Sequence, residues 1–512
     1  MKNQKKFLFI TMAAIILLFG VIFGVGWQNG GVTETVGFQY ANLNFMVDAS
    51  SKALDGIKGD GVASDSRALQ TAVDQVAAVG RTLCLPAGKY RLTNNLNIPS
   101  NVEVVFARDA VLALDSNVVL TVDGTITAGN YQIFTGAGTV TSAQSSVIGN
   151  PVWFGAKGDG KTDDTAAFQK ALDAFSQVDV PESSAGYVIS GNGLVLKTNQ
   201  KFQGEDGTKA KLIASANTKY MMQIPKSNVQ ISDISFDMTK SANGICVYFD
   251  NSVNALEKIH VSDIDVLNAY RIVTDANSGK LIVTTTIERV NAKKGKGSAF
   301  ILNNFWGFIY ITDVILDYSQ SINVNYSGFV LNDNEGGVLT NVTVKGNDVP
   351  SDTAHGIYLD NCLAVWLYHC SAEKFGGAGY YITRNNAGRS QHIYLQNCKS
   401  ENNKKQGFYV LGSYLQFESI SALNNEECGM EIAASTKCIN VSNATFTGNK
   451  SHGLKVAPSN SGSVYAAISG NNNSGYLVNG EAAANTYVNL TGTGNSLGIN
   501  NSTIRGRVTS VD

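Results

Sequence analysis

The sequence predicts an all-β fold: a single-stranded parallel β-helix with short N-terminal capping helices and an N-terminal transmembrane helix. Three observations support this prediction. Short strands that follow a glycine or another small residue recur roughly every 22 to 30 residues, which is the length of one solenoid coil. Charged residues make up 16% of the 512 residues, and 51 glycines accompany 7 prolines, which suits short strands and tight turns. A glycine-rich motif that precedes a helical pattern occurs twice.

The first 27 residues predict a signal anchor. Three lysines within the first six residues precede an uncharged stretch from Phe7 to Trp27, close to the ~20 apolar residues needed to span a bilayer. This stretch is longer than a usual secretory core, although Gly24-Val-Gly26 would suit a cleavage site. We favour an uncleaved transmembrane helix with its lysines in the cytoplasm and the bulk of the chain outside the cell. Residues 28–55 then form a predicted polar tether.

The glycine-rich motif opens two predicted units. One copy runs from Gly56 to Gln70 and the other from Gly155 to Gln169, and both carry Lys, Gly-Asp-Gly, Asp, Ala and Gln in register. A Ser/Thr/Asp cluster stands where a helix N-cap would accept hydrogen bonds from free backbone N–H groups. Neither copy has the spacing of a phosphate-binding loop. We expect the motif to cap an N-terminal β unit over 56–150 and a parallel β-helix over 151–490.

Ten strands define the predicted coils of the second unit. Each follows a small residue, as in Gly356-Ile-Tyr-Leu and Gly379-Tyr-Tyr-Ile, and a second alternating strand accompanies most of them. Asn-rich turns precede the next glycine, for example at Asn402-Asn403, and asparagine both tolerates left-handed backbone and can bond to the next coil. One coil cannot bury its apolar face alone, so the coils must stack. Residues 491–512 form a predicted C-terminal tail.

Charge and cysteine content exclude several classes of function. The formal net charge is −2 and basic residues cluster only at the extreme N-terminus, which gives nucleic-acid binding no electrostatic support. The seven cysteines lack metal-ligand spacing, so we expect buried free thiols rather than disulfides or a metal site. The cysteines in apolar, strand-like contexts are Cys362, Cys370, Cys398, Cys428 and Cys438.

The paired Gly-Asp-Gly motifs and the coil-length repeat give residues 56–490 a family resemblance. They resemble pectate-lyase-like right-handed parallel β-helices, as found in bacteriophage tailspike depolymerases, polysaccharide lyases, hydrolases and mannuronan epimerases. The resemblance implies a right-handed solenoid, a polysaccharide or cell-surface glycan as partner, and a homotrimer. It implies no required cofactor, although lyases of this fold often use calcium, so Ca²⁺ stays open. Location on a virion surface is the alternative to a membrane-anchored protein with its bulk outside the cell.

A polar ladder at the end of one strand per coil holds the candidate catalytic residues. Its members are Asp250-Asn251, Asp275, Asn303-Asn304, Asn332-Asp333, Asp360-Asn361 and Arg384-Asn385. Stacked coils are ~4.8 Å apart, so carboxylates on adjacent coils can form an acid and base or nucleophile pair, and we predict Asp333 and Asp360 for this pair. Asp352 and His355 add titratable groups in the coil that carries Asp360. Asp352-x-x-His355 loosely resembles the Asp-Pro-His element of mannuronan epimerases, and His355-Gly356 the His-Gly element of polygalacturonases. A turn role for the aspartates and a structural role for His355 stay open.

Four further residues are predicted to bind substrate. Arg384 could hold a uronate carboxylate, and Tyr358 adds a phenol beside the predicted carboxylates. Tyr380 and Trp306 offer rings on which sugars can stack. We expect most other aromatic residues of these coils to lie in the core, because alternation along a strand turns half of its side chains inward. No metal ligands are assigned.

The predicted function is a surface-exposed β-helix that binds and cleaves a polysaccharide. Hydrolysis would use the carboxylates of Asp333 and Asp360, whereas β-elimination would use a base such as His355 or Tyr358. The alternative is a non-catalytic adhesin or viral or cell-surface spike that only binds glycan receptors. An enzyme requires two or more of the candidate residues to converge on one open groove, whereas an adhesin requires only exposed aromatic rings and amides.

Overall fold

The computed structural model describes residues 56–80, 82–321, 326–348, 353–384, 390–457, 463–480 and 495, with the backbone of 46–48 and 486–491. The chain divides into two compact units, Met1–Ala143 and Gln144–Asp512. The predicted transmembrane helix at 1–27 lies outside the described residues, as do nearly all of the predicted tether and tail. Within the described part of the chain, no helix is both long and apolar enough to cross a membrane.

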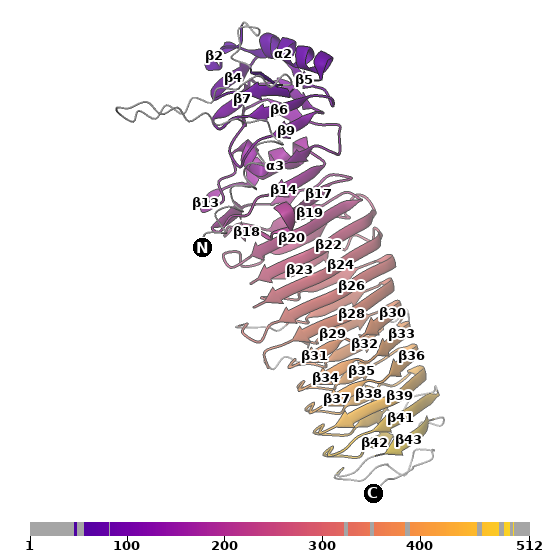
Figure 1. Ribbon diagram of the computed structural model, residues 1–512. Coiled ribbons are helices and arrows are strands. Elements are labelled where there is room, and N and C mark those ends of the chain that lie inside the picture. The colour runs from indigo at the N-terminus through magenta and orange to yellow at the C-terminus, as the bar shows by residue number, and fades with distance from the viewer. Residues whose placement is uncertain are drawn as a thin grey trace, which may run out of the picture. The chain divides into compact units, whose positions relative to one another are not determined.

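The first unit is a short solenoid of three parallel sheets that also contains helix α2, Ser66–Val79 (Figure 1). The sheets follow the orders β1-β3-β6-β9, β10-β7-β4-β2 and β11-β8-β5. Leu69, Val73 and Val76 bury one face of α2, as its helical spacing predicts. The strands are β1 Met46–Asp48, β2 Asp60–Ser64, β3 Thr82–Leu85, β4 Gly88–Leu92, β5 Leu96–Ile98, β6 Glu103–Phe106, β7 Ala110–Leu114, β8 Val119–Val122, β9 Thr125–Thr127, β10 Phe134–Gly136 and β11 Thr139–Thr141.

The carboxylate of Asp65 organises the first glycine-rich motif. Asp65 lies at the N-cap position of α2, but its side chain makes no bond to the N–H groups of the helix. The carboxylate instead accepts from the backbone N–H of Lys58 at 2.6 Å and of Arg91 at 3.2 Å. The prediction that this cluster caps the helix is therefore wrong for Asp65, because its carboxylate instead joins the glycine loop to the neighbouring strand. Gly59 and Gly61 have φ angles of 61° and 75°, which favour glycine.

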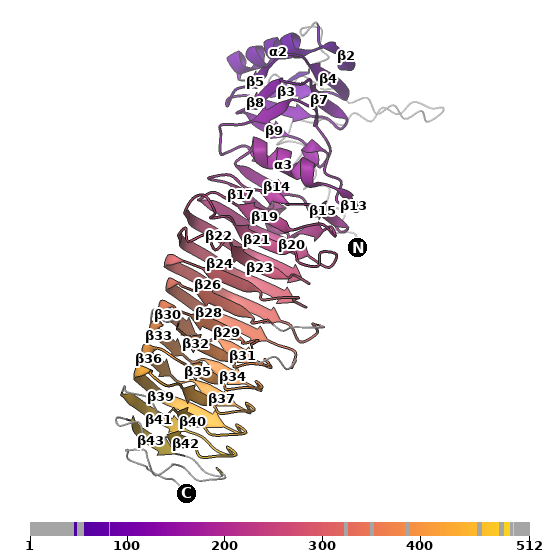
Figure 2. The same ribbon diagram turned by 180° about the vertical axis from the view of Figure 1, so that it is seen from behind.

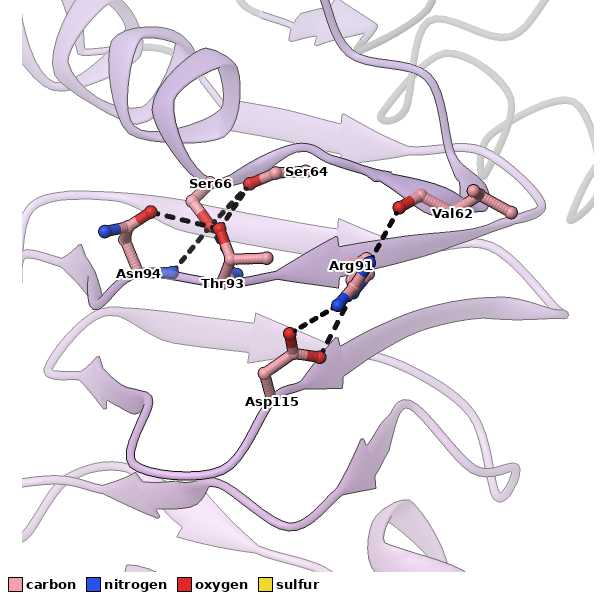
Figure 3. Close-up of polar contacts among 7 residues, drawn as sticks. All are labelled: Val62, Ser64, Ser66, Arg91, Thr93, Asn94 and Asp115. Carbon is pink, nitrogen blue, oxygen red and sulfur yellow. Dashed lines mark hydrogen bonds and ion pairs between the residues drawn. The ribbon is translucent and has the colours of Figure 1, made fainter.

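A polar cluster beside this motif joins the start of α2 to two successive coils (Figure 3). The hydroxyl of Ser66 accepts from the backbone N–H of Thr93 at 2.9 Å. The guanidinium of Arg91 donates to both carboxylate oxygens of Asp115, from Nη2 at 2.8 Å and from Nε at 3.2 Å. Its Nη1 donates to the carbonyl of Val62 at 3.0 Å. Arg91 thus connects the loop of the motif to the next coil, and Ser66 connects the start of α2 to the strand end at Thr93.

The second copy of the motif repeats these contacts in the second unit. Asp164 accepts from the backbone N–H of Lys157 at 2.7 Å and of Gly158 at 3.1 Å. The side chain of Gln169 makes two bonds to the backbone of Val195, at 2.9 and 3.1 Å. Gln70 makes the same two bonds to the backbone of Asn97 in the first unit, at 2.9 and 3.1 Å. The two copies therefore have equivalent structural roles.

The second unit is a longer solenoid of parallel strands stacked one coil upon the next (Figures 1 and 2). Its strands form a 20-stranded sheet, here called sheet D, and a 12-stranded sheet, here called sheet E. Helix α3, Thr165–Ala174, and the 3₁₀ turns η2, Pro151–Phe154, and η3, Glu205–Gly207, belong to its first coils. The predicted all-β parallel solenoid with short N-terminal helices is confirmed.

The strand bounds of sheet D are β12 Ile148–Gly149, β13 Asp159–Asp163, β14 Gln177–Val180, β15 Gly186–Ile189, β17 Lys201–Gly204, β18 Ala210–Ala214, β20 Val229–Asp237, β22 Leu256–Leu267, β24 Ile282–Lys293, β26 Trp306–Asp317, β28 Glu335–Lys345, β30 Leu363–Tyr368, β31 Ser371–Glu373, β33 Gln391–Gln396, β34 Lys399–Glu401, β36 Ser413–Glu418, β37 Ser421–Leu423, β39 Lys437–Thr447, β41 Val464–Ser469 and β43 Thr486–Thr491. Those of sheet E are β16 Leu194–Val195, β19 Tyr220–Ile224, β21 Ile245–Phe249, β23 Arg271–Asp275, β25 Phe300–Asn303, β27 Phe329–Asn332, β29 Ile357–Asp360, β32 Tyr380–Thr383, β35 Phe408–Val410, β38 Met430–Ile432, β40 Leu454–Val456 and β42 Val478–Gly480.

A buried column of asparagines supports one corner of the solenoid, as the Asn-rich turns predict. The Nδ2 of Asn403 donates to Oδ1 of Asn425 at 2.9 Å. Asn425 donates in the same way to Asn449, and Asn449 to Asn473, each at 3.0 Å. All four side chains are fully buried. Each amide therefore satisfies the next coil's amide at a place that water does not reach.

The cysteines follow the prediction with one exception. Cys362, Cys370, Cys398 and Cys428 are buried free thiols. Cys438 is exposed, so its predicted burial is wrong. Ile439 and Val441 on the same strand are buried, so alternation turns the side chain of Cys438 outward.

Replacing Asp164 with asparagine should destabilise the second unit by about 1–3 kcal/mol, because one of the two N–H groups loses a charged acceptor. The midpoint of thermal unfolding, followed by circular dichroism, measures this change. Asp206→Asn makes the same isosteric change at an exposed residue of the same unit and should leave the midpoint unchanged. Equal midpoints for the two variants would contradict a loop-closing role for Asp164.

Candidate functional site

The candidate site lies on the outer side of sheet E, where its strands end. Along β29 the side chain of Ile357 is buried, whereas Tyr358 and Asp360 face outward and are partly exposed. Parallel pairing places Asn303, Asn332 and Asp360 opposite one another on three successive coils. The predicted polar ladder is therefore present as one row of side chains at the strand ends.

Two amides connect this row to a buried carboxyl group. The Nδ2 of Asn332 donates to Oδ1 of Asn303 at 2.9 Å, and the Nδ2 of Asn303 donates to Oδ1 of Asp275 at 2.6 Å. Asp275 is 6% exposed, and its Oδ2 has no hydrogen-bond partner among the described residues. Burial raises the pKa of Asp275 to about 6, although the bond from Asn303 opposes the change.

Asp333 and Asp360 line one hollow of about 470 Å³. Asp333 adopts left-handed backbone, with φ of 52°, and its Oδ1 accepts a hydrogen bond from Nδ2 of Asn361. Burial, and then the charge of Asp333, raise the pKa of Asp360 above its ordinary value. The two predicted catalytic carboxylates are therefore brought together. The full lining comprises Asn277, Ser298, Asn303, Tyr326, Ser327, Val330, Asn332, Asp333, Thr353, Tyr358 and Asp360.

His355 is buried beside this hollow rather than in its lining. Its Nδ1 accepts the backbone N–H of Ala378 at 3.0 Å, and its ring stacks on that of Tyr381 with centroids 4.1 Å apart. Burial lowers the pKa of His355 to about 4, so the ring is neutral at pH 7. A neutral imidazole whose Nδ1 accepts a bond carries its proton on Nε2. The basic nitrogen of His355 is thus already engaged by the backbone.

The two predicted tyrosines occupy opposite sides of sheet E. Tyr358 lines the hollow, and burial together with the charge of Asp360 raises its pKa to about 12. Tyr380 is 1% exposed and stacks on Phe408 inside the core, with ring centroids 4.7 Å apart. Its predicted role in sugar stacking is therefore corrected, because the first residue of each such strand points inward. The outward ring of that strand belongs to Tyr381, which stacks on Tyr409.

The remaining predicted residues lie apart from the hollow. Arg384 donates from Nη2 to the carbonyl of Ser435 at 3.0 Å, so its guanidinium contacts a later coil and does not line the site. Trp306 is 44% exposed, but it begins β26 of sheet D. Asp352 lies outside the described residues.

The family resemblance permits a bound calcium ion but does not require one. Among the described residues, no group of three or more His, Cys, Asp or Glu side chains is arranged to hold a metal ion. The hollow itself offers the carboxylates of Asp333 and Asp360 as anionic oxygen donors. We therefore assign no step of the chemistry to a metal.

Sequence reasoning gave Asp275 and the two amides of the ladder no role in the site. They belong to the predicted ladder, but the bonds that connect them depend on the side-chain rotamers. The signal that could have identified them is spacing, because Asp275, Asn303 and Asn332 each end a strand that follows a small residue. Apart from Trp306, the outward aromatic residues of sheet D were also missed, since alternation alone does not say which half of a set faces outward.

Two family models match separate parts of the chain. Residues 55–150 match the model described as rhamnogalacturonase A/epimerase, pectate lyase-like. Residues 270–439 match the model of the right-handed beta helix region. No curated protein sequence matches the chain.

Several solved structures are similar to this chain at low sequence identity, and the first of them shares its fold. The A-module of mannuronan C-5 epimerase AlgE6 from Azotobacter vinelandii is 18% identical, covers 71% of this chain and 99% of its own, and has a TM-score of 0.50. The Dettilon tailspike protein gp208 is 13% identical over 71% of this chain and 68% of its own, with a TM-score of 0.42. A catalytic domain of a GH87 α-1,3-glucanase is 13% identical, covers 67% of this chain and 66% of its own, and has a TM-score of 0.36. The stacked coils and the two family matches together show that this chain has a pectate-lyase-like, right-handed parallel β-helix fold.

Proposed function

We propose that this protein binds a polysaccharide along the outer side of sheet E and hydrolyses it with the carboxyl groups of Asp333 and Asp360. The observation that carries the proposal is the shared hollow, in which the charge of Asp333 helps to raise the pKa of Asp360. Two carboxyl groups with different protonation are the requirement of glycoside hydrolysis. The names of the matched family model and of the epimerase module with the same fold also refer to polysaccharide enzymes.

Asp360 is assigned as the general acid and Asp333 as its ionised partner. A protonated Asp360 would give its proton to the glycosidic oxygen as the bond to the sugar breaks. Asp333 would then either activate a water molecule or attack the sugar directly, depending on the separation of the two carboxyl groups. Water supplies the hydroxyl of the new reducing end and returns the proton, so the reaction balances.

The hollow favours a neutral saccharide over a uronate. Its described lining contains two carboxyl groups and no Lys, Arg or His side chain. β-Elimination requires a base and a cation that neutralises the uronate. Tyr358 has a raised pKa and His355 has its Nδ1 engaged, so neither is placed as that base.

A second candidate function is glycan binding without cleavage, as in an adhesin or spike. One observation favours it: Asp313 also has left-handed backbone, with φ of 56°, and accepts from Nδ2 of Asn341 at 2.8 Å. The arrangement of Asp333 and Asn361 thus recurs at a bend outside the hollow, where it serves the turn. Exposure on a cell or virion surface, membrane attachment through residues 1–27 and a homotrimer suit either function and remain part of the proposal.

Asp360→Asn and Asp333→Asn should each reduce the release of reducing ends by about 10²-fold or more, because each removes an acid or base group. The assay incubates the purified protein with neutral and acidic bacterial polysaccharides. Asp313→Asn is the matched control, since it alters an aspartate of the same backbone conformation outside the hollow, and it should retain activity. Full activity of Asp360→Asn would refute the assignment, and glycan binding without any product would support the adhesin.

Activity should fall as pH rises through the pKa of Asp360, because the acid form exists only below that value. Since burial and the charge of Asp333 raise this pKa, the fall should occur above the range of an ordinary aspartate. A profile of kcat/KM against pH measures it. Tyr358→Phe should leave the position of this fall unchanged, whereas loss of all activity in that variant, with unsaturated products from the wild type, would indicate elimination.

Asp275→Asn should make the stability of the protein less sensitive to pH between about 4 and 6. A carboxyl group whose folded pKa is raised from 3.8 to about 6 stabilises the fold fully below the lower value, and this stability is lost as pH rises through the upper value. The change corresponds to about 3 kcal/mol, at about 1.36 kcal/mol per pKa unit. Thermal midpoints of both proteins at several pH values test this expectation, which parallel curves would contradict.

A further inference from the structure

The outer side of sheet D carries a row of aromatic and amide side chains, none of which lines the hollow at Asp333 and Asp360. Parallel pairing places Trp366 opposite Tyr394, Tyr394 opposite Gln416, and Gln416 opposite Asn440. Tyr465 follows Asn440 on the next coil. Neighbours along these strands, such as Leu395 and Phe417, are buried. Five successive coils thus present one outward row.

This row borders two adjoining hollows. One has a volume of about 460 Å³ and is bordered by Trp366, Tyr394 and Gln416. The other has a volume of about 470 Å³ and is bordered by Gln416 and Tyr465. His392 and Tyr414 line both hollows, so the two form one continuous groove, here called the aromatic groove.

Two of the residues that line both hollows have left-handed backbone. His392 and Tyr414 have φ angles of 54° and 57°, although their side chains are large. Left-handed backbone costs free energy for residues other than glycine, and asparagine and aspartate tolerate it best. The same column has left-handed backbone on other coils as well, at Lys258, Thr284, Gly336, Ala364 and Cys438. The bend therefore belongs to the solenoid, and on two successive coils the residue at the bend carries a ring.

The two strained residues present their rings side by side. The rings of His392 and Tyr414 are nearly parallel, at 9°, with centroids 5.3 Å apart. Tyr414 is 53% exposed, and so is Tyr465. Exposed rings that lie parallel on neighbouring coils, at the ~4.8 Å strand spacing, suit a ligand with a repeat close to the length of one sugar.

The polar groups of the aromatic groove select the class of ligand. Gln416, Asn440 and Ser442 offer amide and hydroxyl groups that can bond to sugar hydroxyls. The one carboxylate of the described lining, Glu418, accepts from Nε2 of Gln396 at 3.2 Å and from the hydroxyl of Tyr394. The described lining contains no Lys or Arg side chain to balance an acidic sugar.

We propose that the aromatic groove on sheet D is a second glycan-binding site, which takes a neutral oligosaccharide lying along the solenoid axis. The sugar rings stack on His392, Tyr414 and Tyr465, and the amides of Gln416 and Asn440 bind their hydroxyls. The site is separate from the hollow at Asp333 and Asp360 and performs no cleavage. Its occupancy does not depend on the proposed hydrolysis, so either proposal can fail alone.

The test measures binding of neutral hexasaccharides, namely maltohexaose, cellohexaose and laminarihexaose, to the full-length protein by isothermal titration calorimetry. All proteins carry Asp360→Asn, so that no product forms. Tyr414→Asn and His392→Asn should each weaken binding of the best hexasaccharide about ten-fold or more, through loss of a stacking face. The thermal midpoint should stay the same or rise, because asparagine relieves the strain.

Ser419→Asn provides the matched control. Ser419 has a φ of 52° at the end of the same coil but lines neither hollow, so this variant should bind like the parent. Unchanged binding in Tyr414→Asn, or no binding of any of the three hexasaccharides to the parent, would overturn the proposal. A lowered midpoint in Tyr414→Asn would assign the ring to packing. Sedimentation that shows self-association lost in Tyr414→Asn would assign the face to a second copy of the chain.

Discussion

The constraint on which this fold depends is the hydrogen bonding between coils. Each inner strand of sheets D and E must pair in parallel with a strand of the coil before it and a strand of the coil after it, in fixed register. Register in turn decides which side chains stack, because a slip by one residue would move every outward side chain into the core. Functional groups therefore occur as columns along the solenoid. The row of Asn303, Asn332 and Asp360 and the row from Trp366 to Tyr465 are both consequences of this pairing.

Local sequence patterns predicted the architecture because each coil repeats the same order of strands and turns. Small residues before strands, alternation along them and asparagine at the corners are all visible in the sequence, and the column from Asn403 to Asn473 was expected from them. The phase within a strand was harder to predict. In Gly379-Tyr-Tyr-Ile both candidates are tyrosines, and only the structure shows that Tyr380 points inward and Tyr381 outward.

Other features depend on contacts between coils that one sequence does not contain. His355 could not be placed from sequence, because its burial and the bond at Nδ1 come from Ala378 on the next coil. The rings of His392 and Tyr414 escaped notice for a different reason. Left-handed backbone is expected at Gly and Asn, and neither residue gives that signal.

The buried asparagine column aligns the dipoles of its side-chain amides. From Asn403 onward each Nδ2 donates to the Oδ1 of the following coil, so the amide dipoles of the column all point the same way and polarise one another. The column ends on Asn495, which accepts from Asn473 at 2.8 Å. The bonds from Asn332 to Asn303 and from Asn303 to Asp275 run in the opposite direction along the chain. The solenoid thus contains two lines of aligned amide dipoles that point in opposite directions. Turning over the amide of one coil would break its hydrogen bonds to the coils on either side.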